Sequence, residues 1–355
     1  MGQKLIPIRN TDGSIADMQS LSRAEQAGLS ANKHAAQNVF IEYMSRMAKN
    51  TLRVQRVALA KYAEFLEAVG LDPGDLQFDP QAWKGTTWGM VEAFKKWLVG
   101  DGYAIATINL MLSSIRTYTG LAAKAGVISV EESILISHVK GYSDQEAIHI
   151  DDQREKTRVG VKKESPVRLT PRQAKRLKLH PDVPQGRRDA VLMCLLLDHG
   201  LRCSEVAGLK VGDFDLEAGQ MTFYRPKTND TTTHNLSDDT LRAVWDYAEY
   251  GDMPIGSNEF LLRSSRKNKS GEILTGPGMS ARGISKRVQR LGWELLGIDN
   301  LSPHDCRHYW ATYWAKHINE LPRGVFTLKE AGGWKSLSMV DTYIEASKIA
   351  NEGMS

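Results

Sequence analysis

LSPHDCRHYWAT, residues Leu301–Thr312, places two histidines, an arginine, an aspartate and a cysteine in five consecutive positions. Ser302 and the proline after it are typical first residues of a helix, so His304 and Arg307 are predicted to lie in its first two turns. His304 and His308, four residues apart, would share one helix face and could bind a metal. His304 and Arg307, three residues apart at a helix N-terminus, could instead bind a phosphate. In a third interpretation these are ordinary surface or core histidines.

The metal interpretation lacks further ligands. Zinc hydrolysis needs a third protein ligand and a carboxylate that activates the bound water. Asp305 is shorter than the usual glutamate, and His317 would lie about two and a half turns further along a continuous helix. The three cysteines, Cys194, Cys203 and Cys306, show no paired spacing. We therefore expect neither a metal nor a cofactor.

A phosphate site built on this helix would need a second guanidinium, a proton donor and a nucleophile. DHGLRCSEVAGL supplies Arg202 after a glycine turn, although alone this arginine would form a structural salt bridge to Glu205. FYRPKTND supplies Lys227 at a predicted strand-to-turn junction, from which a long side chain can reach into a cleft. AGGWKSLSMVDTYIEAS supplies Trp334 and, nine residues later, Tyr343; each alone would be an ordinary core aromatic residue.

Taken in chain order, these residues resemble the pattern of the tyrosine recombinase (phage integrase) family, which is Arg, Lys, His-x-x-Arg, His or Trp, and Tyr. The matching residues are Arg202, Lys227, His304, Arg307, Trp334 and Tyr343. The resemblance covers Leu169 to about Ser347, and GLRCSEVAGL and HDCRHYWAT look like the two arginine boxes of the family. Most members carry histidine at the position of Trp334, and a minority, including Cre-like enzymes, carry tryptophan. The chain is thus similar to the Cre/Xer two-domain type.

The resemblance implies a mechanism. Tyr343 would attack the scissile phosphate and become joined to the 3′ end, while the 5′ hydroxyl leaves. Arg202 and Arg307 would stabilise the charge of the transition state, and Lys227 would protonate the leaving oxygen. His304 would accept or share the tyrosine proton, with Glu205 and His308 in supporting roles. An indole N–H can donate a hydrogen bond but cannot shuttle a proton at neutral pH, so Trp334 would act by donation and packing.

The resemblance also implies the partners. We expect a homo-tetramer on double-stranded DNA with a specific recombination site, exchanging strands through a Holliday junction without metal or ATP. Neither a membrane nor a small-molecule substrate is expected. Two alternatives stay open: a type IB topoisomerase, which relaxes DNA as a monomer, and a DNA-binding regulator that does not cleave.

The pattern along the chain predicts a mainly α fold with a small antiparallel β-sheet. We expect a flexible arm over residues 1–29, a helical domain over 30–140, a polar, basic linker over 141–167, and a second domain over 168–355. The resemblance implies that the helical domain is a SAM-like core-binding domain and that the second is the catalytic domain. In the helical domain, helices are expected from a cap at Ser30, from a cap at Thr51 to Gly70, and over Thr87–Val99, Ala104–Ala125 and Ser129–Val139. In the catalytic domain Thr170 should cap a helix, and Arg187–Asp198 should form an apolar one.

Composition is that of an ordinary globular protein, with 41% hydrophobic and 25% charged residues. The longest apolar run, Ala190–Leu197, has the length of a core helix, and the first thirty residues lack an apolar signal region. Together with the unpaired cysteines, this predicts a cytoplasmic protein, and the DNA partner that the resemblance implies would make it nucleoid-associated. The net charge is +4, but Gln153–Arg188 holds twelve lysines and arginines against three acids. This basic segment is either a solvated surface or a strip that follows a nucleic-acid backbone.

Overall fold

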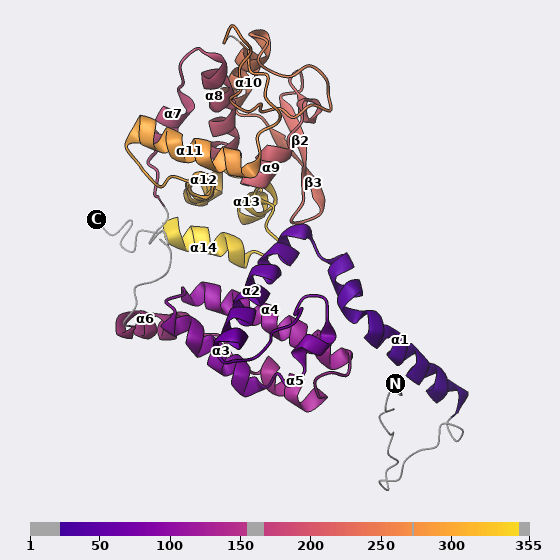
Figure 1. The fold of residues 1–355 in the computed structure, drawn as a ribbon. Helices are drawn as coiled ribbons and strands as arrows, with labels where there is room; N and C mark the ends of the chain where they lie inside the picture. Colours follow the sequence, from indigo (N-terminus) through magenta and orange to yellow (C-terminus); the bar gives the residue numbers. More distant parts are fainter. Residues whose placement is uncertain (1–21, 155–166, 272, 348–355) are drawn as a thin grey trace. The chain divides into compact units, whose positions relative to one another are not determined.

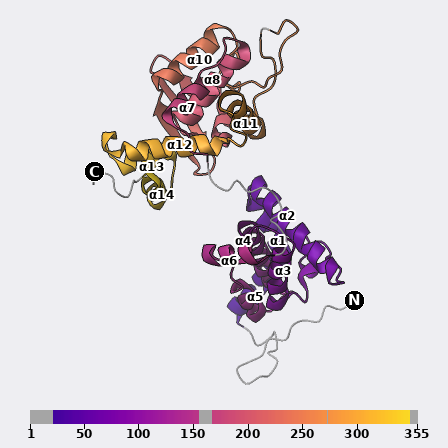
Figure 2. The same ribbon diagram turned by 90° about the vertical axis from the view of Figure 1, so that its left-hand side faces the viewer.

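The computed structural model describes residues 22–154, 167–271 and 273–347. The chain divides into two compact units, Met1–Lys162 and Lys163–Ser355, which are described separately (Figures 1 and 2). Both are mainly helical, and a three-stranded antiparallel sheet lies in the second, as the sequence predicts. Among the described helices, none combines the length and apolarity that crossing a membrane requires.

The first unit packs its helices around a column of aromatic rings. Trp83 lies between Tyr62 and Tyr118, with ring centroids 5.7 and 6.1 Å away and ring planes within 20° of parallel. All three residues are fully buried, and the Trp83 indole N–H donates to the carbonyl of Leu76 at 2.9 Å. The described elements are α1 (Arg23–Arg46), α2 (Lys49–Ala68), the 3₁₀ turn Pro80–Trp83, α3 (Trp88–Gly100), α4 (Ile105–Lys124), α5 (Val130–Ser137) and α6 (Asp144–Gln153).

Several predicted helix ends are confirmed. Thr87 and Ser129 cap α3 and α5 by accepting hydrogen bonds from backbone N–H groups of the first turn. Gly70 and Gly126 follow α2 and α4 with φ of 80° and 75°, a left-handed conformation that favours glycine at the end of a helix. The local sequence therefore predicts these ends of α2, α3, α4 and α5 correctly.

The start of α1 corrects the prediction. Ser22 and Glu25 form a reciprocal capping box, so the helix begins at Arg23 and Ser30 lies inside it. Residues 23–29 are therefore helical and not part of an arm; the rest of the predicted arm, residues 1–21, lies outside the described residues. α2 begins at Lys49 without a side-chain cap, so Thr51 also lies inside a helix.

Helix α6 occupies part of the predicted linker. Ser143 and Glu146 form a second capping box, and Ala147 and Ile150 pack against the core of the first unit. The backbone of Tyr142 is held by Asn109 of α4, which donates to its carbonyl at 2.8 Å and accepts from its N–H at 2.9 Å. Because this segment is mostly polar, its sequence predicted a linker. Two apolar side chains and a capping box are nevertheless enough to hold α6 against the first unit. Residues 155–166 of the predicted linker lie outside the described residues.

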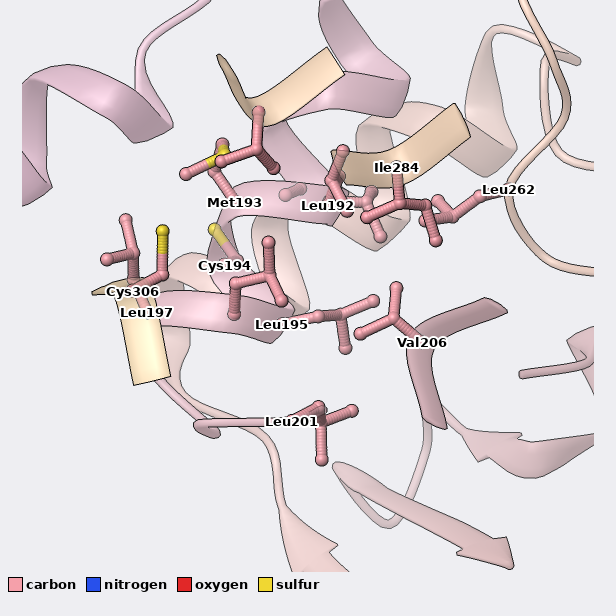
Figure 3. Close-up of a cluster of buried hydrophobic side chains, with 14 of the residues drawn as sticks. Leu192, Met193, Cys194, Leu195, Leu197, Leu201, Val206, Leu262, Ile284 and Cys306 are labelled. Carbon is pink, nitrogen blue, oxygen red and sulfur yellow. The ribbon is translucent and has the colours of Figure 1, made fainter. Parts of the chain in front are cut away.

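The core of the second unit is built around α8 (Pro184–Leu197). Leu192 and Leu195 gather with Val206 and with Ile284 in one cluster, drawn in Figure 3. Thr170 caps α7 as predicted, whereas α8 begins at Pro184, three residues before the predicted Arg187. The other described helices are α7 (Pro171–Lys178), α9 (Cys203–Gly208), α10 (Asp238–Glu249), α11 (Ala281–Leu296), α12 (Pro303–Lys316), α13 (Val325–Gly332) and α14 (Ser338–Ser347).

The sheet runs β1 (Phe214–Asp215), β2 (Gln220–Arg225) and β3 (Asp230–Asn235) in that order, with antiparallel pairs throughout. Exposed and buried residues alternate along β2, as expected for a strand with one face on a core. The described residues between Gly251 and Ser280 form turns and isolated bridges.

Candidate active site

One cleft of about 610 Å³ in the second unit brings the predicted residues together. Its walls include the ends of α9, α11 and α12, the turn after β2, and the segment from Trp334 into α14. The predicted residues that line it are Arg202, Lys227, His304, Arg307, Trp334 and Tyr343. These side chains span more than 140 positions of the sequence, so their convergence is a property of the fold.

Arg307 lies in the second turn of α12 and is 4% exposed. Its guanidinium donates to the carbonyl oxygens of Gly200 and Gly332, each at 2.5 Å, and its central carbon lies 4.9 Å from the centre of the Trp334 ring. Burial and, next, the nearby Arg202 lower the pKa of Arg307 to about 10, so it remains a cation at neutral pH.

Arg202 follows the turn at Gly200, where φ is 59°, and forms the N-cap of α9. Its guanidinium donates to Glu205 Oε1 at 2.8 Å and to the carbonyl of Gly333 at 3.2 Å. Glu205 is 3% exposed and also accepts from the backbone N–H of Arg202 at 2.8 Å. The predicted salt bridge is therefore present, and the arginine still reaches the cleft.

Tyr343 and Trp334 form one side of the cleft. Their rings lie 5.2 Å apart, and Trp334 also packs against Trp310 with ring centroids 6.0 Å apart. Both side chains are largely buried. Burial raises the pKa of the Tyr343 phenol, and the charges of Arg307 and Arg202 act in the opposite direction. At neutral pH the phenol is protonated, so it needs a proton acceptor before it can act as a nucleophile.

His304 and His308 lie face to edge on α12, with their Nε2 atoms 3.0 Å apart. At this distance one ring donates a hydrogen bond to the other, so the pair holds a proton between its two nitrogens. The ring of His308 lies 5.1 Å from that of Tyr343. Within the described residues, no cluster of three or more histidine, cysteine or carboxylate side chains is arranged to bind a metal.

Lys227 lies in the turn between β2 and β3 and is exposed. Two hydrogen bonds from backbone N–H groups hold this turn, from Thr228 and Asn229 to the carbonyl of Arg225 at 3.2 and 2.9 Å. The strand-to-turn placement predicted for Lys227 is confirmed, and its side chain borders the cleft.

Other residues that line the cleft escaped the sequence interpretation: Cys203, Ser204, Ala281, Arg282, Ser285, Pro303 and Met339. Buried Arg225, which contacts Glu205 behind the cleft wall, was missed as well. Its one sequence signal is the alternation along QMTFYR, which puts Arg225 on the same strand face as Met221 and Phe223.

Known proteins resemble this chain over the unit that holds the cleft. The model of the phage integrase family matches residues 167–349. Tyrosine recombinase XerC of Roseiflexus castenholzii is 24% identical over 308 residues, covering 84% of this chain and 83% of that protein. Tyrosine recombinase XerA of Thermococcus kodakarensis is 24% identical over 275 residues, covering 73% and 91%.

Solved structures share the fold. A lambda integrase dimer bound to a COC′ core site superposes with a TM-score of 0.56 at 15% identity, covering 88% of this chain and 94% of that one. The Tn1549 transposon integrase in complex with circular intermediate DNA gives a TM-score of 0.56 at 16% identity, covering 87% and 94%. The match of the family model over half of the chain, together with these relatives, shows that the chain belongs to the phage integrase family of tyrosine recombinases.

Proposed function

We propose that this chain is a site-specific recombinase that cuts and rejoins duplex DNA through a 3′-phosphotyrosine intermediate. The observation that carries the proposal is the convergence of the Tyr343 phenol with the guanidiniums of Arg202 and Arg307 in one cleft. A phenol supplies the nucleophile, and two fixed cations match the charge that grows on a phosphate during displacement.

In the proposed reaction, the Tyr343 oxygen forms a bond to phosphorus as the bond to the 5′ oxygen breaks. The phenolic proton passes to the imidazole pair, His304 being the member that lines the cleft. Lys227 gives a proton to the leaving 5′ oxygen, and a 5′ hydroxyl attacking in reverse restores the phosphodiester. Because the phosphotyrosine keeps the energy of the broken bond, rejoining needs no ATP.

The proposed partner is double-stranded DNA with a specific site, bound by four copies of the chain. The relatives XerC and XerA both carry the name tyrosine recombinase, and a lambda integrase tetramer bound to a Holliday junction shares the fold with a TM-score of 0.55. In this proposal the helical first unit is the core-binding domain and the second is the catalytic domain. Contacts to base edges would select the DNA sequence, and lysine and arginine contacts to phosphates would position the protein on the duplex.

The test is covalent capture on nicked suicide duplexes, in which a nick beside the cleavage point lets the short product leave. A library with randomised sequence yields the preferred site when adducts are isolated under denaturing conditions and sequenced. We expect an adduct from the wild type and none from Tyr343→Phe, with equal binding of duplex by both.

Two outcomes contradict the proposal. Binding without an adduct on any library member would indicate a regulator that does not cleave. Adducts without sequence preference, with relaxation of supercoiled plasmid and no recombination between two selected sites, would indicate a topoisomerase.

A further inference from the structure

Arg225 is a charged residue on the buried face of a strand. It is the last residue of β2, on the side that carries Met221 and Phe223, and it is 1% exposed. Burying a guanidinium is costly unless its N–H groups are satisfied, so its contacts define its role. Burial is also the main cause that lowers the pKa of Arg225.

The hydrogen bonds of Arg225 leave no donor for a substrate. Nε donates to Thr232 Oγ1 at 3.0 Å, and Nη1 lies 3.3 and 3.2 Å from the two carboxylate oxygens of Glu205. Nη2 donates to the carbonyl of Ala331 at 2.6 Å and lies 3.2 Å from Nε2 of His234. A guanidinium has five N–H donors, and these groups occupy all three nitrogens. Arg225 therefore cannot touch the phosphate while these contacts hold.

Three arginines bind three consecutive carbonyl oxygens where α13 ends. Arg225 donates to Ala331 at 2.6 Å, Arg307 to Gly332 at 2.5 Å, and Arg202 to Gly333 at 3.2 Å. The last carbonyls of a helix lack partners within it and carry the negative end of its dipole, so they attract cations. We call residues 331–333 the carbonyl triplet. It fixes the two cleft arginines relative to each other.

Arg225 ties this triplet to the strand and to Glu205. Glu205 receives Arg202 and Arg225 together, so one carboxylate is shared by two cations. The shared carboxylate holds Arg202 in place, and Glu205, Arg202 and Arg225 together keep a net positive charge. Gly333 has φ of 58°, and a Cβ there would lie 2.8 Å from Cδ of Arg225, so the end of α13 is shaped around this side chain.

We infer that Arg225 is a positioning residue for cleavage: it holds Glu205 and the carbonyl triplet together, and through them it aims Arg202 and Arg307 at the scissile phosphate. The inference rests on the proposed function. It concerns a residue that does not itself line the cleft, so its loss should slow the chemical step and spare DNA binding.

The test compares Arg225→Met, which removes the donors, with Arg225→Lys, which keeps the charge without the planar fork. Arg188→Met is the matched control, because Arg188 is 0% exposed in the same unit but pairs with Asp189 and with the carbonyl of Arg263. Each variant is assayed for duplex affinity, thermal unfolding and single-turnover adduct formation at saturating enzyme, at a temperature where all are folded.

We expect Arg225→Met to form adduct about 10²-fold more slowly, the loss typical of a misplaced catalytic group, with duplex affinity within about threefold of wild type. Arg225→Lys should stay within about tenfold of Arg225→Met, because one ammonium cannot reach Glu205, Ala331 and Thr232 together. Arg188→Met should lose thermal stability and keep a rate of adduct formation within about threefold of wild type. Should Arg225→Met fail to fold, Thr232→Val removes only the Nε acceptor and should slow the reaction by about tenfold.

Three results would overturn the inference: an Arg225→Met rate near that of wild type, full recovery in Arg225→Lys, or an equal loss in Arg188→Met. Crystal structures of the wild type and Arg225→Met decide it independently of activity. We expect the guanidiniums of Arg202 and Arg307 to move by about 1 Å or more, and unchanged positions contradict the inference. A wild type that forms no adduct would defeat the proposed function, while the two crystal structures would still show whether Arg225 positions Arg202 and Arg307.

Discussion

At the scale of single residues, the two cleft arginines are held by different kinds of acceptor. Arg307 donates to two backbone carbonyls, which fix its direction without cancelling its charge. Arg202 donates to a carboxylate that it shares with Arg225. In both cases positive charge remains for a phosphate, and the orientation is set before DNA arrives. Such preorganised charge is usually the largest contribution to catalysis of this kind.

Trp334 permits a test of packing against hydrogen-bond donation. Its ring contacts Arg307, Trp310 and Tyr343, so Trp334→Ala should leave a cavity and cost about 3–5 kcal/mol of stability. Trp334→Phe keeps an aromatic face but loses the indole N–H. If packing dominates, Trp334→Phe should form adduct within about tenfold of wild type and Trp334→Ala should lose about 10²-fold. Single-turnover assays decide, and equal losses in both variants would show that the N–H is needed.

Two buried histidines should make the second unit sensitive to acid. Burial is the main cause that lowers the pKa of His199 to about 3 and that of His234 to about 4. Both are neutral in the folded state, whereas the unfolded chain binds protons below about pH 6.5. Their contribution to stability is therefore present above about pH 6.5 and is lost as the pH falls from there towards about 4 for His234 and about 3 for His199.

The measurement is urea unfolding at pH 7, 6 and 5 for the wild type and His199→Gln. The Nε2 of His199 pairs with the Thr240 hydroxyl at 3.0 Å, a bond that a glutamine amide can replace. We expect the free energy of unfolding to fall less steeply as the pH falls in the variant, by on the order of 2 kcal/mol between pH 7 and 5. Parallel curves for the two proteins would show that His199 titrates normally in the folded state.

At the scale of elements, the end of α13 depends on its glycines. Gly333 and Gly297 both have left-handed φ, of 58° and 68°, at the ends of α13 and α11. A Cβ at Gly297 meets nothing within 4 Å, whereas one at Gly333 would overlap Arg225. Gly297→Ala should therefore cost only the backbone term, about 1–2 kcal/mol.

Gly333→Ala should cost clearly more than Gly297→Ala and should also slow adduct formation, because Arg225 must move. Thermal unfolding and single-turnover cleavage measure the two effects. Equal stability losses, or an unchanged cleavage rate in Gly333→Ala, would show that the end of α13 absorbs a methyl group without disturbing the arginines.

Capping residues predict the starts of several helices correctly. The caps at Thr87, Ser129 and Thr170 gave the correct starts of three helices. The start of α1 and the whole of α6 were missed although each helix has a Ser-x-x-Glu box, because both helices bury few residues and so lack a clear apolar period. Apolar periodicity detects burial, and a helix that buries little is found from its cap alone.

The six predicted cleft residues were identified from the family pattern, which consists of side chains expected to contact the substrate. The carbonyl triplet could not be found that way. Every residue type has a backbone carbonyl, so the sequence does not show which carbonyls bind an arginine. A charged side chain at the end of a strand also suggests a position in solvent rather than in the interior. The support of the site is therefore visible only in three dimensions.

At the scale of the whole molecule, the basic segment Gln153–Arg188 is only partly available to a nucleic acid. Lys178 pairs with Asp198 and Asp239, and Arg187 pairs with Asp182 and Asp252. Arg188 is fully buried beside Asp189. These cations stabilise the second unit, so local charge counts overstate the surface that could follow a DNA backbone.

The composition of the cleft predicts which copy of the chain supplies the nucleophile. Tyr343 is 6% exposed, packs on Trp334 and lines the same cleft as Arg202 and Arg307 of its own chain. Each active site should therefore be assembled in cis. A mixture of Tyr343→Phe and Arg202→Ala chains would then contain no complete site, since one chain lacks the nucleophile and the other lacks a transition-state cation.

We expect this mixture to form no adduct above the level of Arg202→Ala alone, with both variants shown to bind and assemble on the selected duplex. A tagged Arg202→Ala chain of different mass identifies the donor of any tyrosine on a denaturing gel. An adduct on the Arg202→Ala chain that appears only in the mixture would mean that its Tyr343 leaves the Trp334 wall and enters a partner's cleft. The buried packing of that ring makes such an exchange costly, because the contacts between Tyr343 and Trp334 would have to break in every cycle.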